Sequence, residues 1–334
     1  MQPSPASDRH PSVHDHSVPT RGRPPASGRE IRDQPTGGPP SRRTITRVPG
    51  RRPEPRRGRP AECEPQVLGV VDGTETADYV AHTATLRGVV RQRLVTRALV
   101  EHLPPPPARL LDIGGGNGVQ ALEFARRGYE VTVCEPDPGM LVEARRALAD
   151  APEVVRRRVA LVEGDGREAA RLVGIGWDAT FCHGVIMFVP EPAPLLEVLV
   201  EVTRPGGIIS VVGKNGPALA LRAGLQGRWQ DTTAQLGEPT PAASTGSATS
   251  TGAAGQPAVI PPGGDDPANV SAILTAAGTR PLARYGIRIF TDHLGDTPPG
   301  PDLDAVVDAE WAAGTRDPYR GIARLIHHVH CRLR

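Results

Sequence analysis

The sequence predicts an α/β fold, a doubly wound and mostly parallel seven-stranded sheet with helices on both faces. Two observations predict it. Short apolar runs alternate with amphipathic stretches from residue 109 to the end of the chain. A glycine-rich turn at 114–118 follows the first apolar run and precedes an amphipathic stretch. Strands that alternate with helices pair in parallel, because each crossover helix packs back onto a face of the sheet.

The elements can be placed in order from the same pattern. A leading helix is expected from about Ala77, and the prolines at 104–107 end it. Strands are expected at 109–113, 130–134, 159–162, 178–182, 207–212, 283–290 and 325–332. Helices are expected at 119–127, 140–148, 167–172, 194–203, 268–277 and 303–313. The Arg-Pro-Gly-Gly run at 204–207 is expected to be a turn into the fifth strand.

Two segments of low complexity flank or interrupt this pattern. Residues 1–65 hold 13 Arg and 7 acidic residues with almost no large apolar side chains. Such a leader cannot bury enough surface to offset its chain entropy, so we predict disorder. It could be a basic arm that binds RNA, a linker, or the product of a misplaced start codon. The Ala-, Ser-, Thr-, Gly- and Pro-rich stretch 236–263 is predicted to be a surface insertion in a single domain spanning 66–334.

Composition excludes several classes of protein. Residues 66–334 carry 26 basic and 30 acidic side chains, a net charge that does not suit clamping a long duplex. The four cysteines are scattered, which argues against a disulfide scaffold and against a metal site. No apolar run approaches the roughly 18 residues of a membrane span, and the N-terminus has no apolar signal region. We therefore expect a cytoplasmic protein without a metal.

The strongest motif is the run Asp-Ile-Gly-Gly-Gly-Asn-Gly at 112–118. Glycines here let the backbone pass close under a nucleoside at the carboxyl end of the first strand. Nicotinamide enzymes share such turns, but they usually carry an apolar residue in place of Asp112. The spacing of an acid before alternate glycines favours S-adenosyl-L-methionine (SAM). The candidate cofactor-binding residues of this motif are Asp112, Gly114, Gly115, Gly116 and Gly118.

Further candidates follow the next three strands. Glu135 ends the second strand about 20 residues after the glycines, where an acid accepts hydrogen bonds from ribose hydroxyls. Pro136 and Met140 come next, and Met140 can pack on an adenine face. After the third strand stand Asp165 and Gly166, an acidic–small pair suited to the adenine amino group, and the fourth strand ends at His183, which could equally be a satisfied core histidine.

These motifs resemble class I SAM-dependent methyltransferases, and more closely the tRNA 5-carboxymethoxyuridine methyltransferase family, over roughly 77–334. Thr85-Leu-Arg87 is similar to the family's Leu-Arg pair, which implies that Arg87 holds the SAM carboxylate. The runs at 181–189, 286–292, 317–319 and 324–327 are similar to further family signatures. Gly184, Met187, Lys214 and Leu325 depart from the family pattern, as does the insertion 236–263.

The resemblance implies that the enzyme esterifies the carboxylate of a modified wobble uridine in the tRNA anticodon loop. That acceptor is already ionised at neutral pH, so it needs orientation by a cation and no general base. The candidate catalytic residues are Arg288, Arg324 and Lys214, and an Arg offers a fork matched to a carboxylate. Candidate stacking rings are Trp229, Tyr285, Trp311 and Tyr319, although Trp229 and Trp311 are also typical of a core. Two alternatives stay open: a methyltransferase acting on a small-molecule carboxylate or hydroxyl, and a non-catalytic SAM-binding protein.

Overall fold

The computed structural model describes residues 73–237 and 266–334. The predicted leader 1–65, the proposed domain boundary at residue 66 and nearly all of the predicted insertion 236–263 lie outside these ranges. None of the helices within them is long and apolar enough to cross a membrane. No group of His, Cys, Asp or Glu side chains in the same ranges is arranged to hold a metal ion.

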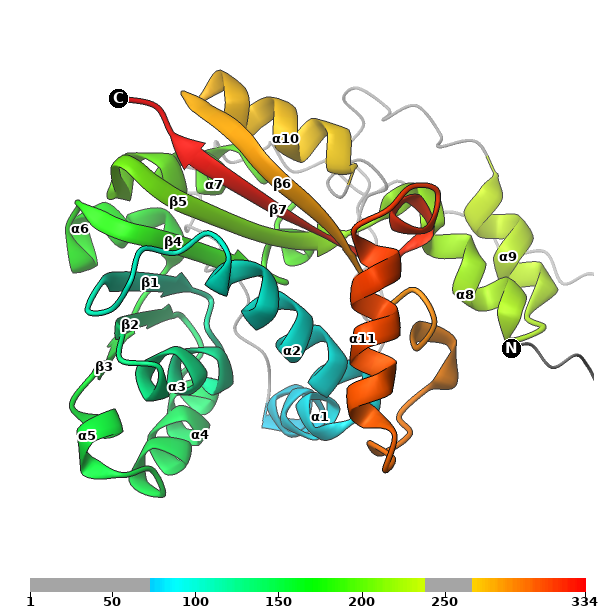
Figure 1. Ribbon diagram of the computed structural model, residues 1–334, viewed down its shortest axis with the longest axis horizontal. Helices are drawn as coiled ribbons and strands as arrows, with labels where there is room; N and C mark the ends of the chain where they lie inside the picture. Colours follow the sequence, from blue (N-terminus) through cyan, green and yellow to red (C-terminus); the bar gives the residue numbers. More distant parts are fainter. Residues whose placement is uncertain (1–72, 238–265) are drawn as a thin grey trace, which may run out of the picture. The chain divides into compact units, whose positions relative to one another are not determined.

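A single seven-stranded sheet forms the centre of the described chain (Figure 1). Its spatial order is β3-β2-β1-β4-β5-β7-β6, and β7 alone is antiparallel to its neighbours. The predicted mostly parallel, seven-stranded α/β fold is therefore confirmed. The strands are β1 Arg109–Ile113, β2 Glu130–Glu135, β3 Val159–Glu163, β4 Trp177–His183, β5 Thr203–Lys214, β6 Thr279–Ile287 and β7 Leu325–Arg332.

Helices cover both faces of the sheet because the central strands are apolar on both sides. Leu110 of β1 packs in a core with α2 (Leu86–Val100), α3 (Val119–Arg126) and α11 (Leu303–Gly314). Leu111, the next residue, packs on the opposite face with α6 (Ala169–Val173), α7 (Ala193–Val202) and α10 (Pro267–Ala276). The two-residue period of the strand thus divides the core into two layers.

The remaining helices surround the sheet edges. They are α1 (Gly73–Ala84), α4 (Pro138–Ala149), α5 (Glu153–Arg156), α8 (Leu219–Leu225) and α9 (Trp229–Leu236), with short 3-10 turns η1 Gly166–Glu168, η2 Ile186–Phe188, η3 Gly216–Ala218, η4 Asp292–Leu294 and η5 Tyr319–Ile322. The leading helical stretch is two helices, because Thr85 interrupts it and caps α2 by accepting a hydrogen bond from Gly88 N–H. The helices α5, α8 and α9 are short and weakly patterned, and the sequence did not predict them.

Two strand boundaries differ from expectation. The run 204–207 is not a turn before β5 but a bulge inside it, since Trp177 pairs with Thr203 and Ala179 pairs with Ile208. The strand β6 ends at Ile287 instead of residue 290. Arg288 there has a φ of 61°, a left-handed conformation that breaks the extended chain.

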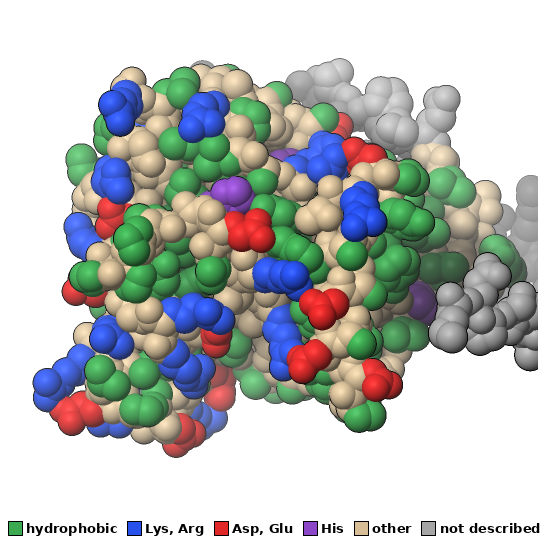
Figure 2. Space-filling view, in the orientation of Figure 1, with side chains coloured by type: hydrophobic (Ala, Val, Ile, Leu, Met, Phe, Trp, Pro, Cys, Tyr) green, Lys and Arg blue, Asp and Glu red, His purple; other side chains and the backbone are tan. Residues whose placement is uncertain are grey.

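Arginine and aspartate side chains line the seam between α2 and α11. Arg93 pairs with Asp304, and Arg97 pairs with Asp308 at 2.8 Å. Figure 2 shows basic (blue) and acidic (red) side chains next to one another along this seam. Because all four side chains are largely exposed, each pair contributes on the order of 0.5 kcal/mol at most to folding.

Candidate cofactor and acceptor site

The glycine-rich loop lies at the carboxyl end of β1, between β2 and β4, where the strand order reverses. Gly114, Gly116 and Gly118 have φ values of 67°, 56° and 74°, which side chains other than glycine rarely adopt. Gly118 is also the residue before α3, so the loop ends on a helix N-terminus. These torsions turn the backbone sharply between β1 and α3.

Side chains would close the space above this loop. A Cβ on Gly114 would overlap the side chain of Val185, and a Cβ on Gly115 would lie 2.8 Å from Asp112 Oδ2. A Cβ on Gly116 would lie 3.4 Å from the ring of Tyr79, on α1. The loop therefore forms a cradle that is bare of side chains and covered by α1.

Asp112 presents a buried carboxylate to this cradle. It is 2% exposed, and its Oδ2 has no hydrogen-bond partner among the described residues. Burial raises its pKa to about 7, with Glu135 adding to the shift and Arg91 opposing it. An unpartnered, buried carboxylate is costly unless a cation or donor binds it. This site therefore fits a ligand with a positively charged group.

Glu135, at the end of β2, holds the other side of the cradle. One carboxylate oxygen accepts from Gly116 N–H at 2.8 Å and the other from Asp137 N–H at 3.1 Å. Burial raises its pKa, and these two backbone hydrogen bonds oppose the shift. Each oxygen keeps a further lone pair, so the carboxylate can still accept from a diol.

The residues after Glu135 form the start of α4. Pro136 is half-buried, and Asp137 caps the helix by accepting from Gly139 N–H and Met140 N–H. Met140 is 6% exposed. The predicted Met140 position thus belongs to the first turn of α4 beside the end of β2.

Asp165 and Gly166 follow β3 at the same edge of the sheet. Asp165 accepts from Arg167 N–H at 2.8 Å and makes an ion pair with the Arg167 guanidinium at 2.6 Å. Gly166 is buried, and a Cβ there would overlap the side chain of Ile113 at the end of β1. The glycine thus lets the β3 loop approach the end of β1, next to the glycine-rich loop.

Arg87 is buried near the N-terminus of α2 and pairs with Asp296. The same aspartate lies 3.6 Å from His82 Nδ1, on α1. Asp296 is 71% exposed on its side chain, so the Arg87 ion pair is open to exchange with another carboxylate.

His183 takes part in a buried chain of side chains across three strands. Its Nε2 lies 2.7 Å from Ser210 Oγ, which lies 2.7 Å from His327 Nε2. Burial lowers the pKa of His183 well below its ordinary value and that of His327 to about 3. Both rings are therefore neutral, and because the hydroxyl carries one proton, at most one of the two imidazoles accepts from Ser210 at Nε2 and the other must donate to it. The side chain of His183 faces the core, and its backbone carbonyl faces Arg91.

The predicted acceptor cations converge at one edge of the sheet. Leu325 is in register with Lys214 at the end of β5 and with Ile287 at the end of β6. Arg324 and Arg288 directly adjoin these positions, and Arg324 N–H donates to the Arg288 carbonyl at 3.3 Å. All three residues therefore lie at the carboxyl edge, although they are up to 110 positions apart in sequence.

Asp292 is the common partner of three arginines. Its carboxylate lies 3.0 Å from Arg288 Nη2 and 3.8 Å from the Nε atoms of Arg324 and Arg222. Arg288 and Arg222 alone place two guanidinium groups against one carboxylate, which leaves a positive charge in excess. Burial lowers the pKa of Arg288 to about 10, so this guanidinium still carries its charge at neutral pH. Because its own aspartate only partly neutralises it, the arginine cluster is suited to a negatively charged ligand.

Sequence reasoning missed four residues that build this edge. Arg91 donates from Nη2 to the His183 carbonyl at 2.8 Å, and that atom would lie 3.2 Å from a Cβ on Gly184. Asp292 belongs to the turn after β6, and Glu310 of α11 accepts from Ile289 N–H in that turn. Asn215 ties η5 to β5 through Gly321 and Ala323. Glu310 and Asn215 belong to no local motif, and Asp292 was noted only as the end of the run 286–292. Only Arg91 carried a signal, as an Arg on the same helix face as Arg87.

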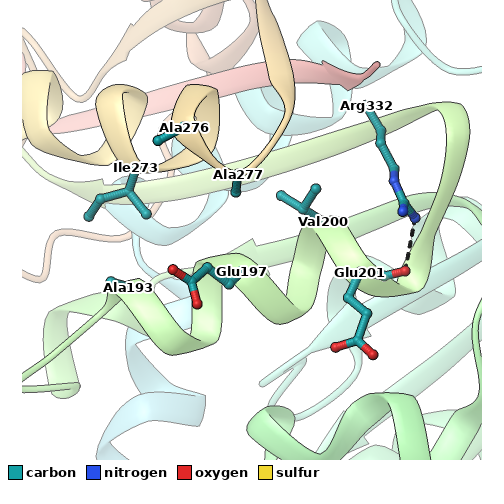
Figure 3. Close-up of a pocket in the computed structure, with 8 residues that line it drawn as sticks. All are labelled: Ala193, Glu197, Val200, Glu201, Ile273, Ala276, Ala277 and Arg332. Atoms are coloured by element: carbon teal, nitrogen blue, oxygen red, sulfur yellow. Dashed lines mark hydrogen bonds between the residues drawn. The ribbon is translucent and has the colours of Figure 1, made fainter. Parts of the chain in front are cut away.

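A separate hollow of about 490 Å³ lies between α7 and α10 (Figure 3). Ala276, Ala277, Val200 and two glutamates line it, and Arg332 caps α7 by donating to the Glu201 carbonyl at 2.9 Å. Arg332 ends the antiparallel β7, so this hollow lies toward the amino ends of the parallel strands. It is therefore remote from the glycine-rich loop and takes no part in the site.

Comparisons with known proteins agree with this geometry. Residues 111–209 match the family described as a methyltransferase domain. The chain is 28% identical to the tRNA 5-carboxymethoxyuridine methyltransferase of Escherichia coli (strain K12) over 73% of this chain and 88% of that protein. It is 31% identical to a ubiquinone biosynthesis O-methyltransferase of Xanthomonas axonopodis pv. citri (strain 306), over 36% of this chain and 49% of that protein. It is also 34% identical to a demethylmenaquinone methyltransferase of Parafrankia sp. (strain EAN1pec), over 32% of this chain and 46% of that protein.

The α/β sheet, the bare glycine cradle with its unpartnered Asp112 and the match to methyltransferases point to one class. A loop without side chains beside a buried acid suits a nucleoside ligand that carries a cationic group. SAM is such a ligand. None of these features requires the alternative of a non-catalytic SAM-binding protein. The protein is a class I SAM-dependent methyltransferase, with SAM as its cofactor, and it resembles the tRNA 5-carboxymethoxyuridine methyltransferases.

Proposed function

We propose that this enzyme methylates a carboxylate, and that the acceptor is 5-carboxymethoxyuridine at the wobble position of tRNA. The observation that carries the proposal is the arginine cluster around Asp292. Its excess positive charge lies at the same edge of the sheet as the glycine cradle. A carboxylate that enters this cluster gains a bidentate partner, and each of its oxygens keeps a second lone pair with which it can react.

The cofactor residues have separate tasks in this proposal. Asp112 binds the ammonium group, Glu135 accepts from the ribose hydroxyls, and Arg87 exchanges Asp296 for the cofactor carboxylate. Pro136, Met140, Asp165 and Gly166 enclose the adenine. The glycines Gly114, Gly115, Gly116 and Gly118 keep the cradle free of side chains, and His183 supports it from the core.

SAM supplies an electrophilic methyl group on a sulfonium. The acceptor oxygen forms a bond to the methyl carbon as the carbon–sulfur bond breaks, so S-adenosylhomocysteine leaves and no proton moves. The protein has to orient the acceptor and exclude water. Arg288 is suited to orientation because packing and the Asp292 pair fix its guanidinium. Arg324 and Lys214 complete the charge around the acceptor.

The choice of tRNA rests on the similarity to the Escherichia coli enzyme over 88% of its length. We also propose that the enzyme acts in the cytoplasm. A small-molecule carboxylate or hydroxyl is the second candidate, favoured by the net acidic charge of residues 66–334.

The test uses the full-length protein, SAM and total tRNA from a strain of the source organism that lacks the gene. After digestion to nucleosides, mass spectrometry should find a gain of one methyl group on carboxymethoxyuridine. Arg288→Met and Arg324→Met should each lower this product at least tenfold, and the exposed Arg93→Met should not. Binding of S-adenosylhomocysteine with no tRNA product, together with methylation of a small carboxylic acid, would discard the tRNA acceptor and keep the chemistry.

A further inference from the structure

Exposed aromatic rings are confined to one edge of the described chain. Only four Phe, Tyr or Trp side chains in residues 73–237 and 266–334 are more than a third exposed. Three follow parallel strands: Phe188 after β4, Trp229 after β5 and Phe290 after β6. The fourth, Tyr319, precedes β7, which is antiparallel and begins at the same edge. Every exposed ring therefore stands in a segment at the carboxyl edge of the sheet, where the arginine cluster lies.

Two of these rings form a pair at the rim of that cluster. Phe290 and Tyr319 are 45% and 47% exposed, with ring centroids 6.3 Å apart and planes at 61°. Phe290 is two residues from Arg288. The turn η5, which begins at Tyr319, also carries Ile322, and Ile322 lines the same small cavity as Arg288 and Arg324.

The backbone beneath both rings is held firmly. Phe290 N–H donates to the buried carboxylate of Glu310 at 3.0 Å. The buried side chain of Asn215 donates to the Gly321 and Ala323 carbonyls at 2.9 and 2.8 Å. Aromatic rings ordinarily gain free energy by burial, so two rings held in solvent on an anchored backbone mark a binding surface.

An exposed cation precedes Tyr319 in the same segment of the chain. Arg316 is exposed three residues before Tyr319, and it makes no ion pair with any residue in the described ranges. Exposed aromatic rings and a guanidinium without an ion-pair partner suit unpaired nucleotides. The base of such a nucleotide can stack on a ring, and its phosphate can form an ion pair with the guanidinium. The sequence had offered Tyr285 and Trp311 as stacking rings, but these pack on each other at 5.1 Å, and Tyr285 is buried.

We propose that Phe290 and Tyr319 form a stacking platform for the unpaired bases that flank the methyl-accepting nucleotide, and that Arg316 contacts their phosphate. The inference rests on the proposed tRNA acceptor and extends it. The arginine cluster holds the reacting carboxylate, and the platform holds the neighbouring bases. The enzyme would then bind a splayed loop more tightly than the isolated nucleoside.

The test compares two substrates in the full-length enzyme: an anticodon stem–loop that carries 5-carboxymethoxyuridine, and that nucleoside alone. Phe290→Ala and Tyr319→Ala should each weaken stem–loop binding about tenfold. Turnover of the nucleoside and affinity for S-adenosylhomocysteine should not change, which also shows that the variants fold. Tyr319→Phe should behave as the unaltered enzyme, because stacking needs the ring. Phe290→Leu should lose affinity, because an apolar side chain without a π face does not stack.

Ile175→Ala is the matched control, since Ile175 is 65% exposed just before β4, at the opposite edge. Alanine variants that bind the stem–loop as tightly as the unaltered enzyme, while that enzyme methylates it, would overturn the platform and leave the proposed function standing. An unaltered enzyme that methylates neither the stem–loop nor tRNA would overturn the proposed acceptor, and the platform with it.

Discussion

Thr291 donates two hydrogen bonds to the carboxylate of Glu310, from its backbone N–H at 2.9 Å and from its hydroxyl at 2.7 Å. Glu310 belongs to α11 and is fully buried, and it also accepts from Ile289 N–H and Phe290 N–H. These bonds shape the turn from Arg288 to Asp292. One carboxylate on a distant helix thus sets the geometry of the arginine cluster.

Removing this carboxylate should destabilise the protein and disorganise the acceptor site. Glu310→Ala leaves three backbone donors buried without partners, so we expect a loss of roughly 3 kcal/mol or more in unfolding free energy. Urea unfolding measures it, with the exposed Asp308→Ala expected to change stability by less than about 0.5 kcal/mol. Equal midpoints for the two variants would show that the turn forms without Glu310.

Cofactor affinity should depend on the ionisation of Asp112. Burial raises its pKa to about 7, so below pH 7 the free protein carries a proton that a cationic ligand must displace. Affinity for S-adenosylhomocysteine, which keeps the ammonium group, should therefore fall as pH decreases from 8 to 6. Calorimetry at each pH measures this, and Asp112→Asn should bind weakly with little pH dependence. A parallel pH profile in that variant would assign the effect to another group.

Arg91 should matter for the acceptor more than for the cofactor. It belongs to α2 and donates to the His183 carbonyl at the end of β4, and its charge lowers the pKa of both Asp112 and Arg288. Arg91→Met should lower kcat/KM for an acidic acceptor about 10- to 100-fold, the worth of one charged hydrogen bond. Arg93→Met on the same helix is the control and should retain activity. A matching loss in S-adenosylhomocysteine affinity would instead give Arg91 a cofactor role.

Acid should destabilise the fold through buried histidines. Burial lowers the pKa of His327 and His328 to about 3 and that of His330 to about 4, from 6.5. Between pH 6.5 and about 4 the unfolded chain binds protons that the folded chain does not, so stability rises with pH. Asp112 and Glu135, whose pKa values are raised, act in the opposite direction, and His183, whose pKa burial also lowers, acts in the same direction as the three histidines.

Unfolding free energy from urea titrations at pH 7 and pH 5 measures this loss. His328→Leu removes one of the titrating rings, so its loss between the two pH values should be smaller. An unchanged pH dependence in that variant would show that His328 titrates normally in the folded protein.

Local sequence determined the fold class and the choice of residues for the proposed cofactor half of the site. The two-residue period of the strands, the amphipathic stretches between them and the acid before the glycines are all encoded within short windows. The last strand was predicted at 325–332, and β7 covers Leu325–Arg332. The apolar or amphipathic pattern of a segment depends on its own residues alone. It could therefore be recognised without knowing which segments pack against it.

The acceptor half was decided by the tertiary structure. Lys214, Arg288 and Arg324 meet because β7 inserts antiparallel between β5 and β6, a pairing that no local pattern encodes. Asp292 likewise meets its three arginine partners only in the folded chain. The same holds for Glu310 of α11, whose hydrogen-bond donors lie in the turn after β6. Contacts between residues far apart in sequence depend on strand order and register, and these are settled by packing the whole sheet.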